Sequence, residues 1–346
     1  MRSNFFTESL LNWFENNERN LPWRQTKDPY IIWLSEVILQ QTRVAQGLPY
    51  FLKFAKRFPK VNDFAIAEED EILKLWQGLG YYSRARNMLK TAQLIVEKGA
   101  GFPSTYHELI QLKGIGEYTA SAIASFSANE KVAVVDGNVY RVLSRYFGIH
   151  DAIDQTIGKK NFKKIAEQLL PAANSDQYNQ AIMEFGALQC KPKCPDCSTC
   201  PLSINCIALK ENTINQLPFK SKKQTKKKIN LHYLVFKNAE NILIRQRRGL
   251  GVWEGLYDFA AIEITEKISH DDVLKYSEET FGFTINKIKE PAITYKHILS
   301  HIIYQASFWE IEINSSSKVM DNYHWIDHTL IGNYPVSRLV EKYLEG

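Results

Sequence analysis

The densest group of metal-binding side chains in this sequence is a run of five cysteines within 17 residues, CKPKCPDCSTCPLSINC, which holds every cysteine of the chain. Thiolates packed this closely suit zinc or an iron–sulfur cluster, and overlapping rather than separated pairs favour a cubane cluster. Spacing alone permits two ligand sets, which share Cys197, Cys200 and Cys206 and take either Cys190 or Cys194 as the fourth ligand. Such clustering in a 346-residue chain indicates a metal site in a reducing compartment rather than a disulfide framework.

A carboxylate in an apolar segment is the first candidate for proton transfer. Glu36 lies in IIWLSEVILQQTR, and on a helix its neighbours three and four positions away are Ile32, Trp33, Leu39 and Gln40, none of them basic. An apolar environment raises the pKa of a carboxyl group, as a general acid near neutral pH requires. The ordinary alternative is a solvated glutamate at a helix edge, because charged residues are mostly exposed.

A second carboxylate, Asp136, ends the apolar run VAVV and precedes GNVYR. An aspartate before a helix is most often an N-cap, so its position alone favours a structural role. Between the two carboxylates lies LKGIGEYTA, in which Gly114 and Gly116 flank one isoleucine. This spacing predicts a tight turn that presents the free amides of the next helix to a phosphate, although an ordinary helix–helix turn fits it equally well.

The predicted secondary structure that positions these residues changes from helices to strands near residue 229. Residues 1–209 carry helical periodicity, whereas the later segments are rich in Ile, Val, Tyr and Phe and predict strands, with one helix at 271–282. Helices are predicted at 31–45, 48–58, 72–79, 85–96, 117–128, 138–147, 161–170 and 177–189, and strands at 229–236, 242–245, 293–295 and 302–309.

Composition supports folded domains, because 45% of the residues are hydrophobic and 12% are aromatic. The net charge of +5 is unevenly distributed: residues 1–219 carry +3, the tract KSKKQTKKK at 220–228 carries +6, and residues 229–346 carry −4. The opening residues do not resemble a signal peptide, and there is no run of about 18 apolar residues that would span a membrane.

Several of these segments resemble the endonuclease III and MutY family of DNA glycosylases. The spacing Cys-x6-Cys-x2-Cys-x5-Cys, the hairpin LKGIGEYTA, and the segments WLSEVILQQT and VDGNVYRV carry the resemblance. It covers nearly the whole chain and is most specific at 21–45, 78–87, 112–141 and 190–206.

The resemblance implies a multidomain fold, in which an all-α helix-hairpin-helix region with a [4Fe–4S] loop precedes an α+β Nudix-like domain. We expect the helical catalytic region at 1–216, with a six-helix module at about 29–136 and a cluster module formed by 1–28 and 137–216. A basic linker would follow at 217–229, and an 8-oxoguanine recognition domain at 230–346.

The same resemblance assigns the catalytic roles. Glu36 would protonate N7 of adenine, and an ionised Asp136 would stabilise the oxocarbenium ion, with hydrogen bonds from Tyr118 and Asn138 supporting the site. In endonuclease III-like members that also cleave the backbone, a lysine at the position of Tyr118 forms a Schiff base. Tyrosine has no such chemistry, so the sequence predicts a monofunctional glycosylase. The base must first be flipped out of the duplex.

The remaining implied contacts concern the DNA and the cluster. The family spacing selects Cys190, Cys197, Cys200 and Cys206 as cluster ligands and leaves Cys194 as a spare thiol. Residues implied to bind the base or the opposite strand are Trp23, Arg24, Leu39, Gln41, Thr42, Tyr81 and Gln180, and those implied to contact the backbone are Gly114, Gly116, Lys191 and Lys193.

In the C-terminal part, YKHILSH resembles the loop that reads 8-oxoguanine, which assigns recognition to Ser300 and His301. The segment KYSEETFGF at 275–283 retains only Glu279 and Gly282 of the Nudix box, so we expect recognition rather than pyrophosphate hydrolysis.

We therefore expect an adenine DNA glycosylase that hydrolyses the N-glycosidic bond of adenine opposite 8-oxoguanine or guanine in base excision repair. Its expected partner is double-stranded DNA containing 8-oxoguanine:adenine, and we expect a cytoplasmic, nucleoid-associated monomer with no membrane contact. The alternatives are an endonuclease III-like glycosylase/lyase for oxidised pyrimidines and a non-catalytic iron–sulfur DNA-binding module.

Overall fold

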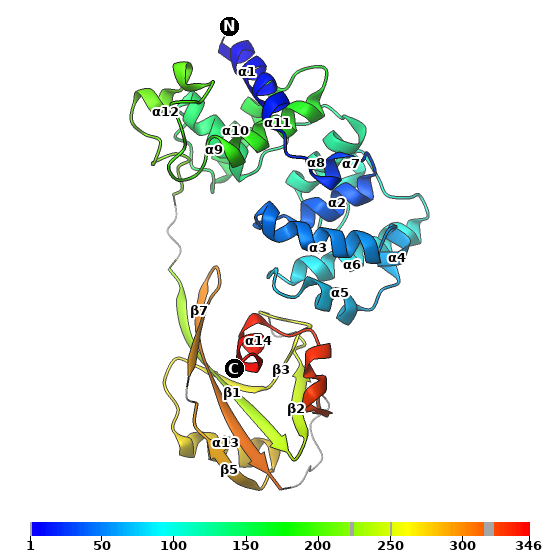
Figure 1. Ribbon diagram of the computed structural model, residues 1–346, viewed down its shortest axis with the longest axis vertical. Helices are drawn as coiled ribbons and strands as arrows, with labels where there is room; N and C mark the ends of the chain where they lie inside the picture. Colours follow the sequence, from blue (N-terminus) through cyan, green and yellow to red (C-terminus); the bar gives the residue numbers. More distant parts are fainter. Residues whose placement is uncertain (1, 222–224, 250, 292, 315–321) are drawn as a thin grey trace. The chain divides into compact units, whose positions relative to one another are not determined.

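A computed structural model describes residues 2–221, 225–249, 251–291, 293–314 and 322–346 of the chain (Figure 1). The chain forms two compact units, and each is described here by itself. Unit 1 comprises Met1–Ala65 with Lys90–Lys223, and unit 2 comprises Ile66–Leu89 with Gln224–Gly346. Unit 2 thus takes Ile66–Leu89 from the segment that the sequence assigns to the helical region. Part of the lysine tract, residues 222–224, lies outside the described residues.

Unit 1 is helical, as the sequence predicts. Its helices are α1 (Arg2–Asn17), η1 (Pro22–Arg24), α2 (Pro29–Ile38), α3 (Val44–Arg57), α4 (Val61–Ala65), α7 (Tyr106–Leu109), α8 (Glu117–Ala128), α9 (Gly137–Phe147), α10 (Thr156–Leu169), α11 (Ser175–Leu188), η2 (Ser203–Asn205) and α12 (Ile207–Lys210). Helix α6 (Ser83–Lys98) begins in unit 2 and ends in unit 1.

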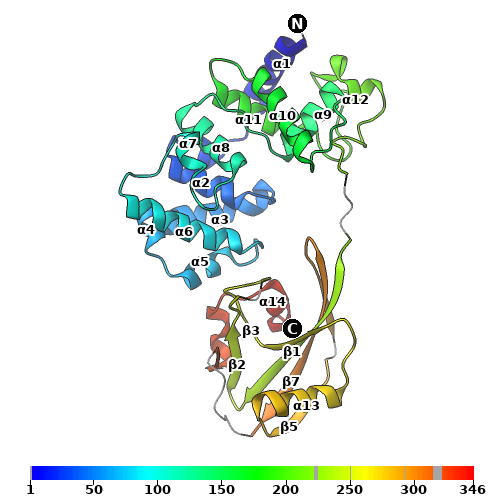
Figure 2. The same cartoon turned by 180° about the vertical axis from the view of Figure 1, so that it is seen from behind.

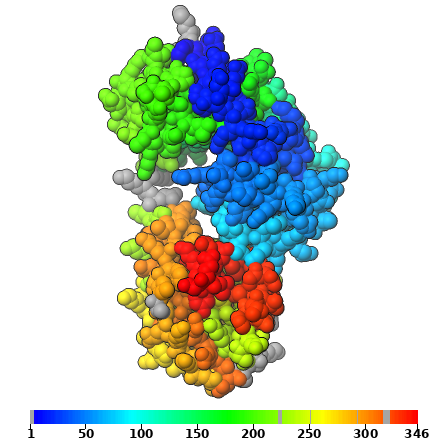
Figure 3. Space-filling view, viewed as in Figure 1, coloured from blue at the N-terminus to red at the C-terminus, as the bar shows by residue number. Residues whose placement is uncertain are grey.

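Two apolar clusters hold unit 1 together. One joins α1, α9, α10 and α11 through fully buried side chains such as Phe6, Leu143 and Phe162. Figure 3 shows α1, in blue, lying against the green segments of this cluster. The other is aromatic: Trp33 of α2 lies 6.0 Å from Phe64 between ring centroids, and both rings are buried. This second cluster fixes α2, the helix that carries Glu36.

The helix predicted at 31–45 is interrupted in the structure. Helix α2 ends at Ile38, and Gln41 adopts a left-handed backbone conformation with φ +57° before α3 begins at Val44. A helix cannot continue through a residue in that region, so the apolar periodicity runs across two helices joined by a turn. Glu36 consequently lies in the last turn of α2, and Leu39 is the capping residue.

Unit 2 is built on an eight-stranded mixed sheet. The long strands β1 (Lys227–Asn238) and β7 (Ile302–Ile313) pair in parallel over eleven registered residues and run side by side in both ribbon views (Figures 1 and 2). The remaining elements are α5 (Glu69–Trp76), β2 (Asn241–Gln246), β3 (Tyr257–Asp258), β4 (Ala260–Ile264), α13 (His270–Phe281), β5 (Ile285–Lys289), β6 (Thr294–Ile298), β8 (Tyr323–Asp327), η3 (His328–Asn333) and α14 (Arg338–Leu344).

Alternate residues of β7 bury the two faces of this sheet. Trp309 joins the cluster that α13 covers, which includes Val273. Its neighbour Phe308 stacks on Tyr343 of α14, with ring centroids 4.2 Å apart. The sheet is therefore covered on both faces, which accounts for the unbroken burial of residues 231–236 in β1.

Helix α5 packs within unit 2 through polar contacts. Asp70 accepts hydrogen bonds from Tyr257 Oη at 2.9 Å and from Gln246 Nε2 at 3.1 Å. Arg86 of α6 forms an ion pair with Glu254 at 2.7 Å. The strands predicted at 229–236, 242–245, 293–295 and 302–309 are confirmed, whereas β3, β4, β5 and β8 were not predicted. Among the described helices, none is long and apolar enough to cross a membrane.

Candidate active site

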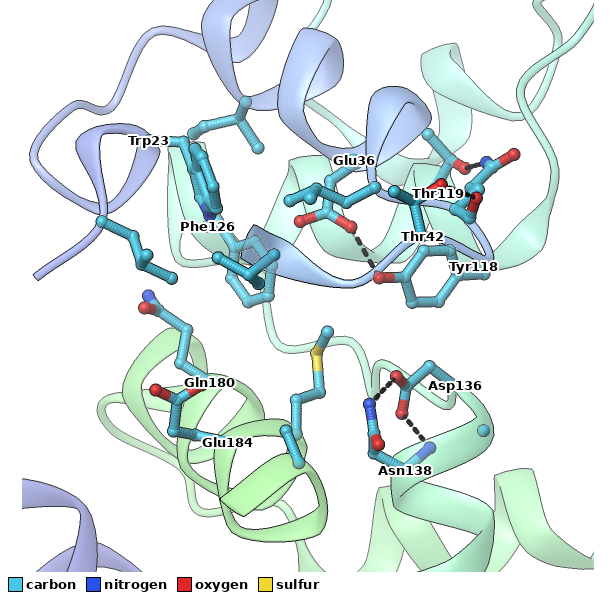
Figure 4. A pocket seen from close by; sticks show the side chains of 18 of the residues that line it. Trp23, Glu36, Thr42, Tyr118, Thr119, Phe126, Asp136, Asn138, Gln180 and Glu184 are labelled. Atoms are coloured by element: carbon cyan, nitrogen blue, oxygen red, sulfur yellow. Dashed lines mark hydrogen bonds between the residues drawn. The ribbon is translucent and has the colours of Figure 1, made fainter. Parts of the chain in front are cut away.

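A cavity of about 1180 Å³ opens among η1, α2, α8, α9 and α11 of unit 1. It gathers segments far apart in the sequence, and two carboxylates enter it from opposite walls (Figure 4). Twelve of the residues proposed from the sequence line it, namely Trp23, Arg24, Glu36, Leu39, Gln41, Thr42, Gly114, Gly116, Tyr118, Asp136, Asn138 and Gln180.

Glu36 is buried, with 7% of its surface exposed, and its carboxylate accepts a hydrogen bond from Tyr118 Oη at 2.6 Å. The pKa of Glu36 is raised to about 7, mainly by burial. The Tyr118 hydrogen bond lowers this pKa, the nearby Asp136 charge raises it, and the Arg24 charge lowers it. The raised pKa expected from the sequence is therefore present. A carboxyl group that titrates near neutral pH can deliver a proton to a leaving group.

Asp136 occupies the N-cap position of α9, and it also lines the cavity. Its Oδ1 accepts from the backbone amides of Asn138 and Val139, both at 2.8 Å, and its Oδ2 accepts from Asn138 Nδ2 at 2.6 Å. Burial raises its pKa, and these three hydrogen bonds with the Arg141 charge oppose the rise. Because all three bonds are donated to the carboxylate, they favour its ionised form.

Arg141 holds this part of the site and has no role in the sequence analysis. Its guanidinium donates to Asn138 Oδ1 at 2.7 Å, to the carbonyl of Gly186 at 2.7 Å and to that of Cys190 at 2.7 Å. A Cβ added at Gly186 would lie 2.6 Å from Cβ of Asn138, so only glycine lets α11 approach α9 this closely. The arginine thus connects α9 to the cysteine loop.

The segment that leads into Asp136 is held by a buried amide side chain. Asn179 of α11 accepts from the Val134 amide at 3.1 Å and donates to Ser125 Oγ and to the Val132 carbonyl, both at 2.9 Å. It is 1% exposed. These contacts satisfy backbone groups of a non-helical segment that have no strand partner, and they fix the approach of the chain to the cavity.

An aromatic ring and two polar side chains also line the cavity. Trp23 packs edge-on against Phe51 and lines the cavity, as does Gln180 of α11 (Figure 4). Arg24 donates to Glu184 of α11, with Nη2 to Oε2 at 2.9 Å. Glu184 was not identified from the sequence, since its partner lies 160 positions away.

The hairpin places free backbone amides at the cavity rim. Gly114 has φ +88°, a conformation that favours glycine, and Gly116 is the N-cap of α8 without a side-chain cap. The first-turn amides of α8 therefore lack a capping acceptor from Gly116, and a helix N-terminus of this kind suits an anion. Gln41 is exposed at the same cavity, and Thr42 lies beside it in the turn.

Four of the five cysteines are half-buried in the cysteine loop. Burial raises the pKa of Cys200 to about 12, with smaller contributions from the charges of Cys190, Cys197 and Cys206, against the opposing effect of the Leu202 backbone amide. The fifth, Cys194, is exposed. Among the described residues, no group of three or more Cys, His, Asp or Glu side chains is placed to hold a single metal ion. Thiol sulfur is the donor that iron–sulfur clusters use, so the residue types suit such a group.

A buried guanidinium adjoins this loop. Arg145 is 2% exposed, and its Nη1 lies 3.5 Å from Sγ of Cys190. It also donates to the carbonyls of Lys191 at 2.7 Å and of Pro192 at 3.1 Å. Lys191 and Lys193 are exposed on this loop and do not line the cavity.

Three of the proposed contact residues belong to unit 2. Tyr81 follows α5, is 50% exposed and has φ +51°. Ser300 and His301 lie in the turn between β6 and β7, where Ser300 Oγ and His301 Nδ1 are 3.0 Å apart and both residues are exposed. All three side chains are thus available to a ligand of that unit.

Comparison with known families identifies both parts of the chain. Residues 34–171 match the model of the HhH-GPD superfamily base excision DNA repair protein, and residues 232–346 match that of the NUDIX domain. Among solved structures, a thermostable thymine-DNA glycosylase aligns with a TM-score of 0.56 at 28% identity, covering 61% of this chain and 97% of that chain. An endonuclease III–DNA complex aligns with a TM-score of 0.53 at 21% identity, covering 61% and 96%, which shows the shared fold.

Curated relatives extend over most of the chain. The adenine DNA glycosylase of Buchnera aphidicola subsp. Baizongia pistaciae is 37% identical over 97% of this chain and 96% of its own length. That of Arabidopsis thaliana is 32% identical over 85% of this chain and 55% of its own length, and that of Homo sapiens is 41% identical over 59% and 39%. Together with the helical fold and the C-terminal sheet, these similarities show that the chain belongs to the adenine DNA glycosylase family.

Proposed function

We propose that the protein is a monofunctional adenine DNA glycosylase of base excision repair, which hydrolyses the N-glycosidic bond of adenine mispaired with 8-oxoguanine or guanine in duplex DNA. The observation that carries the proposal is the pair of carboxylates that enter one cavity with different hydrogen-bond environments (Figure 4). Family membership supports the class of reaction, since relatives across most of the chain length are adenine DNA glycosylases.

The two environments suit two different roles. Glu36 is buried and accepts one side-chain hydrogen bond from Tyr118, so it holds a proton near neutral pH and donates it to N7 of adenine. Asp136 accepts three hydrogen bonds, remains ionised and stabilises the positive charge that develops on the sugar. Water completes the hydrolysis. Asn138 and Tyr118 are supporting residues, one for each carboxylate.

Tyr118 supports hydrolysis without backbone cleavage. Its hydroxyl is bonded to Glu36, and a phenol has no amine with which to form a Schiff base. An endonuclease III-like activity on oxidised pyrimidines is therefore the less favoured function, although the helical fold is shared with endonuclease III.

The flipped adenine would lie in the cavity between Trp23 and Glu36. There Gln180, Arg24 and Leu39 would contact the base. Gln41, with Thr42 beside it, would insert where the base leaves the stack, which offsets an unstacking cost of a few kcal/mol. For Tyr81, in unit 2, we propose a contact with the base of the opposite strand. Both Gln41 and Tyr81 have positive φ, which holds their side chains out on tight turns. Ser300 and His301 would read 8-oxoguanine on the opposite strand.

Backbone contacts would come from the helix N-terminus at Gly114 and Gly116 and from Lys191 and Lys193. We propose Cys190, Cys197, Cys200 and Cys206 as ligands of a [4Fe–4S] cluster that would hold the lysine-bearing loop in place. The exposure of Cys194, in contrast to the half-buried positions of the other four, supports this ligand set. We further propose that the protein acts as a monomer on chromosomal DNA in the cytoplasm.

Single-turnover release of adenine tests the function. With enzyme in excess, we expect release from an 8-oxoguanine:adenine duplex, slower release from guanine:adenine, and none from a duplex with an oxidised pyrimidine. Borohydride should trap no covalent enzyme–DNA adduct above background. Release of the pyrimidine with efficient trapping would establish the endonuclease III-like alternative, and binding without release from any duplex would establish the non-catalytic one.

A further inference from the structure

One buried acidic side chain at the cavity has no part in the chemistry described above. Glu184 of α11 is 2% exposed and faces two arginines of the N-terminal segment. Arg19 donates to it through Nε and Nη2, both at 2.6 Å, and through its backbone amide at 3.2 Å. Arg24 donates through Nη1 at 3.3 Å and Nη2 at 2.9 Å. All three residues line the cavity.

This network carries a net positive charge of one, because one carboxylate faces two guanidiniums. Burial disfavours the ionised form of Glu184, but the hydrogen bonds from Arg19 and Arg24 hold its pKa below the ordinary value. Both carboxylate oxygens of Glu184 accept hydrogen bonds from the arginines, so its negative charge offsets much of the positive electrostatic potential of the two guanidiniums. Exposure of the arginine side chains differs: that of Arg19 is 34% exposed, and that of Arg24 is 13% exposed.

The field of this network reaches the general acid. The charged or titratable groups that act on Glu36 are Tyr118 of α8, Asp136 before α9 and Arg24 of η1. Arg24 is the cation of this set, and it opposes the protonated form that acid catalysis requires. Among the described residues, its charge is partly neutralised by Glu184 and, more weakly, by Glu18, whose Oε1 lies 4.0 Å from Arg24 Nη1.

We propose that Glu184 is a positioning and charge-balancing residue, which locks Arg24 in the base pocket and screens its charge from Glu36 so that Glu36 stays protonated near neutral pH. This inference rests on the proposed glycosylase function. It differs from a purely structural role for the ion pairs, because it predicts a change in the pH dependence of the reaction that follows net charge rather than packing.

The test is the pH–rate profile of single-turnover adenine release from 8-oxoguanine:adenine, from pH 5.5 to 8.5. In Glu184→Gln an uncompensated cation faces Glu36, so the alkaline limb should move down by about half a unit to one unit. The rate relative to wild type should then fall by about three- to tenfold more at pH 8 than at pH 5.5. Glu184→Asp, which keeps the charge, should retain the wild-type limb.

A charge-rescue variant separates electrostatics from structure. The double variant Arg24→Gln, Glu184→Gln removes the cation that acts on Glu36 together with its counter-ion, so its alkaline limb should return to the wild-type position or above it. Asp176→Asn is the matched control, since it removes a carboxylate of the same helix that pairs with Lys27 at 2.7 Å and does not line the cavity. Its limb should not move.

An unchanged limb in Glu184→Gln, or a shifted limb that the double variant does not restore, would overturn the proposal. Failure of the proposed function looks different, because the wild-type protein itself would then release no adenine. Circular dichroism and thermal melting of each variant at pH 5.5 and pH 8 would confirm that the compared proteins are folded, and Glu184→Asp keeps the test available should Glu184→Gln not fold.

Discussion

The hydrogen bond from Tyr118 to Glu36 should set the pH at which catalysis declines. Tyr118→Phe removes a donor that lies 2.6 Å from the carboxylate and favours its ionised form. A hydrogen bond to a charged group contributes about 1.5 kcal/mol, which corresponds to about one pKa unit. From a wild-type pKa of about 7, the pKa of Glu36 should rise toward 8 in the variant.

The sign follows from the role of the proton. A general acid acts in its protonated form, so wild-type excision should decline as pH rises through about 7, and that of Tyr118→Phe as pH rises through about 8. Between pH 6 and pH 8 the wild-type rate should fall about tenfold, whereas that of the variant should fall about twofold. The absolute rate of the variant can be lower, because Tyr118 also shapes the cavity.

Single-turnover excision measured across pH checks this directly. Tyr140→Phe is a suitable control, since Tyr140 of α9 packs edge-on against Phe162 and a phenylalanine keeps that contact. Its alkaline limb should coincide with that of the wild type. An alkaline limb in Tyr118→Phe that stays in place or moves to lower pH would refute the assignment of Glu36 as the acid.

Three further predictions concern stability, the cluster and recognition. The pKa of Glu36 is about 7 in the folded state against an ordinary value of 4.5, so its contribution to stability is complete below about pH 4.5 and is lost as pH rises through 7. Between pH 4.5 and pH 8, the wild type should therefore lose about 3 kcal/mol of unfolding free energy relative to Glu36→Gln, as measured by denaturant melts. Cys190→Ser should lose the visible absorbance of the cluster and Cys194→Ser should retain it; the opposite pattern contradicts the ligand set. Ser300→Ala should reduce the preference for 8-oxoguanine:adenine over guanine:adenine by about fivefold, the effect of one hydrogen bond, and an unchanged preference would remove Ser300 from recognition.

Local signals in the sequence were sufficient to predict most helices and the longer strands. Helix α8 is confirmed at the predicted bounds of 117–128, because Gly116 precedes it and Asn129 ends it in a left-handed conformation. The break between α2 and α3 was not predicted, since apolar residues continue through it and the positive φ of Gln41 leaves no compositional sign. Strands β4 and β8 are short, and their place in the sheet depends on partners far along the chain.

The site shows the same division. Glu36 stands out because a carboxylate among apolar residues is chemically unusual. Asp136 and Tyr118 were assigned by the resemblance of their segments to the glycosylase family. Arg141 and Glu184 could not be identified, because their roles depend on hydrogen bonds to residues 45 or more positions away in the sequence. Examples are the bond from Arg141 to Gly186 and the bond from Arg24 to Glu184. Ion pairs and hydrogen bonds across such separations leave no periodic pattern in a single sequence.

The most direct test of the account compares single-turnover adenine release from an 8-oxoguanine:adenine duplex by the wild-type protein and by Glu36→Gln at pH 6.5. Glutamine keeps the shape of the side chain and removes the proton donor. We predict rapid release by the wild type and a loss of at least about a hundredfold in the variant, the typical contribution of a general acid, with duplex binding retained. Equal rates of release in the two proteins would contradict the central claim.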